Sequence, residues 1–569
     1  MQGMALSHRL QIIEGNTSSA AVRTTLVLAA GMFLLAACAT QPKAGVPEGV
    51  IPSELRQIID ENRRIALPPP HPDLENIMGR FAPPIDEGED ARIAGILRQK
   101  RRGQMHGRSP LQGLGGCFRG ISGAGHLDAF LTHEQLGADI RFLFDLLRHG
   151  YGGYWYFGGD DVFLPIREAM LGRLAGMSKP LQVSSFLNDL ILPALRGVIA
   201  DKHFQVHDIT FWAPSHVLYM NEEFILRRRG SGFVTEIDGA LHRVLEVRDG
   251  NAGLVDGILP TLTPEGEFAW AFGLVRADGR RDAVEITVLL ENTGTGESHS
   301  RRVNLPWVPA APRRPNYPIS VTREVGGITV LENRTLVARA DDLADFFYSG
   351  YLLRDRPVLI MDLRGNSGGL SSLPRRWVGI YTGQEPTGTL LFAASSRRSQ
   401  VMAELHEFFV PYHASVMLRE ARAGSAETEA VCRCRIQEFM PRGLSVNMGV
   451  PRQIPIPNEN LVIVLTDNDA ASGGDLFAGY LRQLENVLFV GTNTLGALVT
   501  GGVGRTRLYH SGLDIMFGTR LNLRPDLSQF EGVGFKPDLW VPPGESLERV
   551  LRFVERYGLA RPQGYESTR

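Results

Sequence analysis

Apolar residues between about 126 and 200 recur at the spacing of a helix. A first stripe consists of Leu136, Ile140, Phe142, Leu143, Leu146 and Leu147, and a second apolar run extends from Leu181 to Leu195. Steps of three and four residues place such side chains on one helix face. The pattern predicts a helical bundle over 126–212. It is interrupted by YGGYWYFGG at 151–159, which either packs in the core or forms a wall facing a substrate.

Apolar and polar positions alternate from 213 to 312. Segments such as HRVLEVRDGN and DAVEITVLLENTG are bounded by Gly, Asp and Asn turns, and the region ends at Pro306 and the hinge PAAPRRPNYP. Alternation with period two is typical of half-buried strands. The sequence therefore predicts a small β-rich domain over 213–312.

The rhythm from 313 to 569 is that of an α/β domain. A helical stretch at 343–353 precedes the apolar strand PVLIMDL at 357–363. The strand LVIVLT, a helix over about 473–484 and the strand VLFVG then predict a βαβ unit with parallel strands. The segment at about 386–455 is longer than one crossover requires, and we interpret it as an insertion.

The N-terminal region carries the pattern of an export signal. The apolar run 24–37 follows Arg23 and is too short to span a bilayer. It ends in Leu-Ala-Ala-Cys, which resembles a bacterial lipobox with Cys38 as the lipidated residue; an ordinary signal peptide is the alternative. We expect a lipoprotein signal peptide over 1–37, and Ala39 indicates sorting to the outer membrane, facing the periplasm. The Pro- and Gly-rich segment 38–125 is interpreted as a tether with little helix.

Composition excludes some partners and leaves others open. The chain has 60 basic and 62 acidic residues, a net charge of -2, so no nucleic-acid partner is expected. The remaining cysteines, Cys117, Cys432 and Cys434, are odd in number, and their disulfide status stays open. Oligomeric state also stays open.

Two polar, glycine-rich motifs follow predicted parallel strands. Arg364–Gly369 (RGNSGG) follows the first strand, and Asp467–Asp475 (DNDAASGGD) follows the second. Ligands gather at the carboxyl ends of such strands, and Ser472 at a helix start beside glycines suits acyl transfer. Each motif alone could be a structural turn. A nucleotide-binding signature is lacking, and an α/β-hydrolase elbow fits poorly because His510 is the only later histidine.

Three ordered motifs resemble peptidase family S41, the tail-specific or carboxyl-terminal processing peptidases. They are DLRGNSGG at 362–369, AASGGDLFAGYL with VGTNTLG downstream, and EGVGFKPD at 531–538. The resemblance extends over about 126–555 and implies a ClpP- or crotonase-like α/β core. It also implies a serine-type peptidase that needs no cofactor and cuts peptides or unfolded proteins.

The resemblance also implies a set of site residues. Ser472 would be the nucleophile. Ala497 stands where one branch of the family has a lysine base, so the tricorn-like branch fits better, with His203 as base and Glu531 as its late acidic partner. The oxyanion would be stabilised by the backbone amides of Gly473 and of Gly368 or Gly369.

Some features depart from the family pattern. Lys202 replaces a serine expected before the histidine, and the β-rich domain lacks a clear PDZ carboxylate-binding loop. If residues 203–207 formed a helix, His203 and His207 would share a face and could bind a metal, although we favour no metal. The alternative function is a noncatalytic lipoprotein that binds a peptide or an apolar ligand on the same fold. Both readings imply an envelope protein attached to the membrane through a lipid anchor.

Overall fold

The computed structural model describes residues 52–64, 71–81, 83, 85–105, 127–211, 215–249, 253–277, 282–315, 318–337, 340–386, 392–394, 399–407, 455–528 and 530–560. These all fall within one of two units, Glu48–Arg569. The predicted signal peptide, the four cysteines (Cys38, Cys117, Cys432 and Cys434) and most of the predicted insertion lie outside the described residues.

A helical region forms where the first apolar stripes were found. It contains α5 (His133–Gly150), α6 (Gly159–Ala175), α7 (Val183–Ser185), the π-helix η1 (Phe186–Ile191) and α8 (Leu192–Leu195), with the short strands β1 (Phe130–Leu131) and β2 (Leu181–Gln182) pairing beside them. Helix α5 starts with a capping box, because Thr132 and Gln135 exchange backbone-to-side-chain hydrogen bonds. Its apolar stripe is buried in the core of this region, as predicted.

The interpretation of 38–125 as a tether with little helix is wrong for its described residues. Three helices lie there: α2 (Ser53–Arg64), α3 (Leu74–Arg80) and α4 (Glu87–Met105). The charged composition masks the apolar residues Ile93, Ala94 and Leu97, which sit at helical spacing in α4 and join the core around α5. A narrow apolar stripe therefore suffices to anchor α4.

The alternating region forms an antiparallel sheet. Its strands are β5 (Val217–Arg229), β6 (Gly232–Ile237), β7 (Ala240–Asp249), β8 (Gly253–Leu254), β9 (Ile258–Leu262), β10 (Phe268–Arg276), β11 (Ala283–Asn292) and β12 (Ser298–Pro306). They follow the order β12-β11-β7-β6-β5-β10-β9, with β8 paired to β7. This agrees with the predicted β-rich segment.

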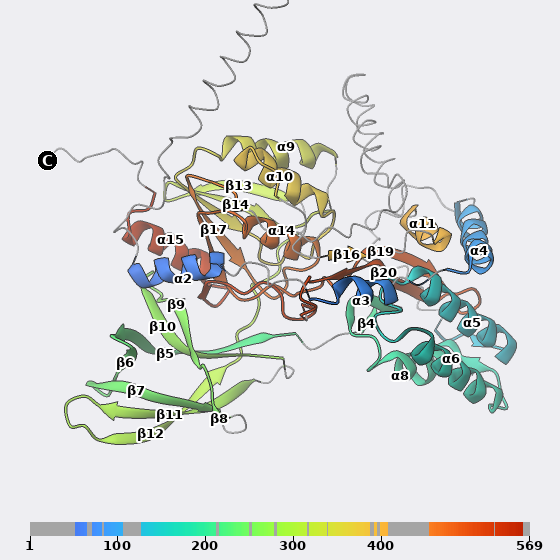
Figure 1. The fold of residues 1–569 in the computed structure, drawn as a ribbon, viewed down its shortest axis with the longest axis horizontal. Coiled ribbons are helices and arrows are strands. Elements are labelled where there is room, and N and C mark those ends of the chain that lie inside the picture. The colour runs from blue at the N-terminus through green and yellow to red at the C-terminus, as the bar shows by residue number, and fades with distance from the viewer. Residues whose placement is uncertain are drawn as a thin grey trace, which may run out of the picture. The chain divides into compact units, whose positions relative to one another are not determined.

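The centre of the α/β part is a six-stranded sheet of order β13-β14-β15-β17-β18-β21. Its strands are β13 (Ser320–Val325), β14 (Ile328–Asn333), β15 (Val358–Asp362), β17 (Leu461–Thr466), β18 (Val487–Gly491) and β21 (Leu539–Trp540). All neighbours from β14 onward are parallel. Helices α9 (Ala340–Leu352), α10 (Ser372–Thr382) and α14 (Gly473–Leu481) share one core with this sheet, and α15 (Ser546–Arg556) contacts β18 (Figure 1). The α/β class and the predicted βαβ unit are confirmed.

A five-stranded sheet combines strands from distant parts of the chain. Its members are β3 (Asp201–Val206), β4 (Ile209–Phe211), β16 (Phe392–Ala394), β19 (Thr500–Arg507) and β20 (Asp514–Leu523), and helix α11 (Gln400–Glu407) packs near it. Strand β3, from the N-terminal half, pairs with β20, from the C-terminal half. Among the described helices, none is long and apolar enough to cross a membrane.

Candidate active site

Ser472 lies at the start of α14, just beyond the carboxyl end of β17. Its backbone is at φ 55° and ψ -112°, a region that L-residues rarely occupy. Two contacts hold it there. The Ser472 N–H donates to Asp475 Oδ2 at 2.6 Å, and the N–H of the preceding Ala471 donates to the Asn366 carbonyl at 2.9 Å. The strained turn leaves the serine partly exposed while its neighbours are buried.

His203 meets this serine. Its Nε2 lies 2.9 Å from Ser472 Oγ, although 269 positions separate the two residues along the chain. The sequence did predict this pair, but it placed the histidine at the end of a helical bundle. The structure places it in strand β3, because Phe204 and Val206 alternate into the core and the strand is held by β20.

Asp201 is the carboxylate that faces the imidazole of His203. Its Oδ1 accepts the His203 backbone N–H at 2.8 Å and lies 4.0 Å from His203 Nδ1. Its Oδ2 accepts hydrogen bonds from the Tyr151 hydroxyl at 2.9 Å and from Thr500 Oγ1 at 2.7 Å. The side chain is fully buried. A buried anion with this many donors is fixed in place, and it faces the base electrostatically.

The imidazole of His203 is held neutral by its surroundings. Burial lowers its pKa from the usual 6.5, the negative charge of Asp201 opposes this, and the positive charge of Arg520 adds to it. A neutral imidazole can accept the proton of a serine hydroxyl. A contact with the Thr500 backbone also opposes the lowering of this pKa.

Glu531 lies close by, in a different role from the one expected. Its Oε1 accepts the backbone N–H of Lys202 at 2.8 Å, and its Oε2 accepts those of Leu498 and Val499 at 2.9 Å each. No described contact joins its carboxylate to the imidazole. It ties the strand that carries His203 to the chain leading into β19. Burial, and next the charge of Asp201, raise the pKa of Glu531 to about 8.

Asp475 holds the Ser472 turn in place by accepting backbone hydrogen bonds. Besides Ser472, it accepts the N–H groups of Gly496 at 2.9 Å and Ala497 at 3.0 Å. Burial raises its pKa to about 6. The position that carries a lysine in one branch of the resembled family thus holds a buried alanine whose backbone braces the nucleophile turn.

The predicted oxyanion glycines lie against the serine, with one distinction. A Cβ on Gly368 would come within 2.9 Å of Ser472 Cβ, and the Gly368 N–H already donates to Asn366 Oδ1 at 2.9 Å. The N–H groups of Gly369 and Gly473 make no hydrogen bond within the described part of the chain. A Cβ on Gly473 would lie 3.0 Å from the Gly369 nitrogen, so the two glycines are adjacent. Gly369 and Gly473 are therefore the candidates to face an oxyanion.

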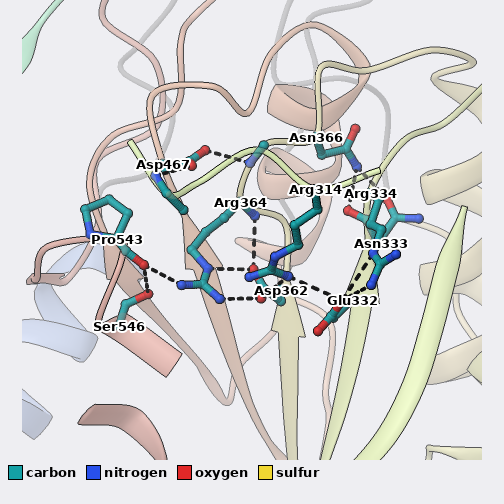
Figure 2. A network of polar contacts seen from close by, with 12 residues as sticks. Arg314, Glu332, Asn333, Arg334, Asp362, Arg364, Asn366, Asp467, Pro543 and Ser546 are labelled. Carbon is teal, nitrogen blue, oxygen red and sulfur yellow. Dashed lines mark hydrogen bonds and ion pairs between the residues drawn. The ribbon is translucent and has the colours of Figure 1, made fainter. Parts of the chain in front are cut away.

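A polar network fixes the motif that contains these glycines (Figure 2). Arg364 forms a bidentate pair with Asp362, at 2.8 and 2.6 Å, and also donates to the Pro543 carbonyl. Asn366 donates to Asn333 Oδ1 at 2.6 Å, at the end of β14. Asp467, after β17, accepts the Gly365 N–H at 2.8 Å. The loop is thus tied to both neighbouring strands and to the turn before α15.

The helical metal site considered for His203 and His207 does not exist in that form. His203 lies in a strand, and His207 sits in the following turn with φ 50°. No cluster of three or more His, Cys, Asp or Glu side chains able to hold a metal occurs among the described residues. Lys202, which departs from the family pattern, donates to Ser215 Oγ at 2.7 Å.

Sequence reasoning missed the support around the base. Tyr151 and Thr500 hold Asp201, yet nothing in the local sequence links them to it. Asp201 itself had a signal, since it stands two residues before His203. The aromatic loop at 151–159 supplies Tyr151 to this buried network, which favours packing over a substrate-facing wall for that residue.

Residues 338–541 match the family model of peptidase family S41. Among solved structures, the chain is similar to mature CPAF, with 15% identity and a TM-score of 0.34, covering 75% of this chain and 96% of that one. It is also similar to the photosystem II D1 C-terminal processing protease (13%, TM-score 0.33, 73% and 96%) and to the tricorn protease (14%, TM-score 0.31, 75% and 37%). No curated protein matches the chain.

The family match covers both glycine-rich motifs, the Ser472 turn and Glu531, while His203 comes from outside it. Residues 338–541 therefore match peptidase family S41 over the part of the chain that carries the Ser472 turn and both glycine-rich motifs.

Proposed function

We propose that the chain hydrolyses internal peptide bonds with Ser472 as nucleophile and His203 as general base. The observation that carries this proposal is the 2.9 Å contact between His203 Nε2 and Ser472 Oγ. It is supported by the neutral state that burial imposes on the imidazole, and by two adjacent glycine amides that have no partner among the described residues.

The chemical steps follow from this geometry. Ser472 Oγ attacks the carbonyl carbon of the substrate while His203 Nε2 takes the hydroxyl proton. The N–H groups of Gly369 and Gly473 donate to the oxyanion of the tetrahedral intermediate. His203 then protonates the leaving amine, and a water activated by the same imidazole releases the acyl group. Asp201, 4.0 Å from Nδ1, stabilises the imidazolium through its charge.

The substrates belong to the class of peptides and unfolded proteins, and the place of action is the cell envelope. This part of the proposal depends on the segment ending at Cys38, which resembles a lipoprotein signal, with the lipid anchor holding the enzyme at the outer membrane, facing the periplasm. Labelling of growing cells with radioactive palmitate would detect the anchor, and Cys38→Ala should abolish that labelling.

Serine-directed labelling tests the catalytic proposal. We expect a fluorophosphonate probe to label the purified protein at Ser472 and to inhibit its cleavage of denatured casein. Ser472→Ala should abolish labelling and lower kcat by roughly 10⁴-fold or more, with an unchanged thermal unfolding curve. His203→Ala should likewise abolish labelling and lower kcat.

The control is Ser511→Ala, because Ser511 lies away from His203 and its buried hydroxyl donates to Asp139 in the helical region. Labelling that survives Ser472→Ala would remove Ser472 from the mechanism. A folded protein that binds peptides but is neither labelled nor active would be the noncatalytic binder.

A further inference from the structure

Arg520 projects from the same face of the five-stranded sheet as His203. The antiparallel pairs Ile515 with Val206 and Met516 with Gln205 set the register between β20 and β3. Arg520 lies four residues beyond Met516 on β20, and His203 lies two residues before Gln205 on β3, so both are an even number of residues from this pair. Side chains opposite each other, or two apart, share a face.

The opposite face of these strands confirms the alternation. Phe204 and Val206 of β3 and Ile515 and Phe517 of β20 all lie in the helical core. Arg520 therefore points away from that core, toward the side where His203 meets Ser472.

A glycine makes room for the guanidinium. Gly501 of β19 pairs with Arg520, and a Cβ built on Gly501 would lie 3.1 Å from Arg520 Nη2 and 3.7 Å from Nε. The arginine thus lies across a position without a side chain. Its Nε is buried, whereas the residue as a whole is only partly buried.

Arg520 has no counter-charge in the described part of the chain. It makes no ion pair and donates no hydrogen bond there, and its buried Nε has no partner. Other largely buried arginines are paired: Arg364 with Asp362, Arg482 with Asp538 and Arg549 with Glu222. A buried charge without a partner is costly, and an unmet guanidinium beside a reactive pair is a site for an incoming anion.

Electrostatics agree with the geometry. Burial lowers the pKa of Arg520, and only the Tyr480 hydroxyl opposes this. The charge of Arg520 in turn lowers the pKa of His203, so the two groups interact across the site. An anion bound at Arg520 would cancel that effect.

We propose that Arg520 is a substrate-binding residue that receives a carboxylate of the peptide being cut. The guanidinium presents a planar fork that matches a carboxylate with two hydrogen bonds. The carboxylate belongs either to an acidic side chain near the scissile bond or to the C-terminus of the peptide. This proposal rests on the proposed function, because it assumes that Ser472 and His203 cut peptides.

Paired peptides distinguish an acidic side chain from the C-terminus as the source of the carboxylate. The probes are quenched fluorogenic peptides in which each position flanking a central bond carries Glu or Gln, each made with a free and an amidated C-terminus. We expect the wild-type enzyme to have a kcat/KM at least about tenfold higher for the carboxylate peptide in one of two comparisons: Glu against Gln beside the bond, or free against amidated C-terminus. In Arg520→Met that ratio should fall close to one, and Arg520→Lys should retain part of it.

Arg505→Met is the matched control, since this arginine of the adjacent strand β19 is paired with Asp514 at 3.2 Å. It should leave the ratio unchanged. Equal fluorophosphonate labelling of wild type, Arg520→Met and Arg520→Lys shows that their active sites are intact. The proposal is overturned if wild type prefers the carboxylate peptide in neither comparison, or if its preference for the carboxylate persists in Arg520→Met. Absence of labelling in wild type would instead overturn the proposed function.

Discussion

At the scale of single residues, the protonation of His203 controls the proposed chemistry. Its imidazole is buried, and burial lowers its pKa below 6.5, so the base is neutral at neutral pH. Asp201 opposes this shift and is held by Tyr151 and Thr500 rather than by the imidazole. The acidic partner therefore acts by charge from a fixed position.

Asp201→Asn tests this role. Since the carboxylate raises the pKa of His203, its neutral replacement should move the acidic limb of the kcat/KM profile to lower pH. The maximal rate should fall roughly tenfold to hundredfold, because the imidazolium loses its nearby charge. Rates measured from pH 4 to 9 with one peptide give both the position of the acidic limb and the maximal rate. Asp208→Asn, an exposed neighbour with positive φ, is the control; a limb that stays put or moves upward contradicts the role.

At the scale of elements, two loops at the carboxyl edge of the six-stranded sheet form the proposed catalytic surface. The loop after β15 supplies Gly369, and the turn after β17 supplies Ser472 and Gly473. Gly369 has φ 137°, lies against the backbone of Leu336 and forms an isolated parallel β-bridge with it. The contact requires a residue without a side chain.

Gly369→Ala should therefore both destabilise the protein and abolish activity. The added Cβ would overlap the backbone carbonyl of Leu336, so the loop has to move and the oxyanion donor moves with it. Gly365→Ala is the matched control: Gly365 also has positive φ, 74°, but a Cβ there meets no atom within 4 Å. We expect a loss of about 1 kcal/mol for Gly365→Ala and a clearly larger loss for Gly369→Ala in urea unfolding. Similar losses for both would refute the packing argument.

At the scale of the whole described unit, distant segments must come together before the site exists. Strand β3 supplies the base and α14 the nucleophile, and Glu531 connects β3 to the chain before β19. The carboxyl groups that brace this assembly are buried. Burial raises the pKa of Asp467 and Asp475 to about 6 and that of Glu531 to about 8.

This predicts an unusual pH dependence of stability. A carboxyl group with a raised pKa binds its proton more tightly in the folded state, so its contribution is present below about pH 4.5 and is lost as the pH rises through 8. Between pH 6.5 and 7.5 Glu531 should dominate, since His203, with its lowered pKa, acts in the opposite direction mainly below 6.5. Urea unfolding should show the free energy falling by about 1 kcal/mol more in wild type than in Glu531→Gln over this interval. Parallel slopes would show that Glu531 does not titrate there.

Much of the fold was predictable from local pattern. The strands β15, β17 and β18 and the helices α5, α9 and α14 follow apolar periodicity that tertiary contacts only reinforce. Predictions failed where the pattern was weak. The stripe of α4 is short and surrounded by charge, and the segment around His203 is too short to distinguish a strand from a helix end.

The sequence by itself determined the two glycine-rich motifs and the serine at a helix start, because these depend on local backbone geometry and residue chemistry. Only the tertiary structure decided which acid faces His203, and which glycine amides and which arginine have no partner among the described residues. Those properties depend on atoms brought together from segments hundreds of residues apart, and hydrogen-bond partnership, burial and charge at such distances leave no trace in local sequence.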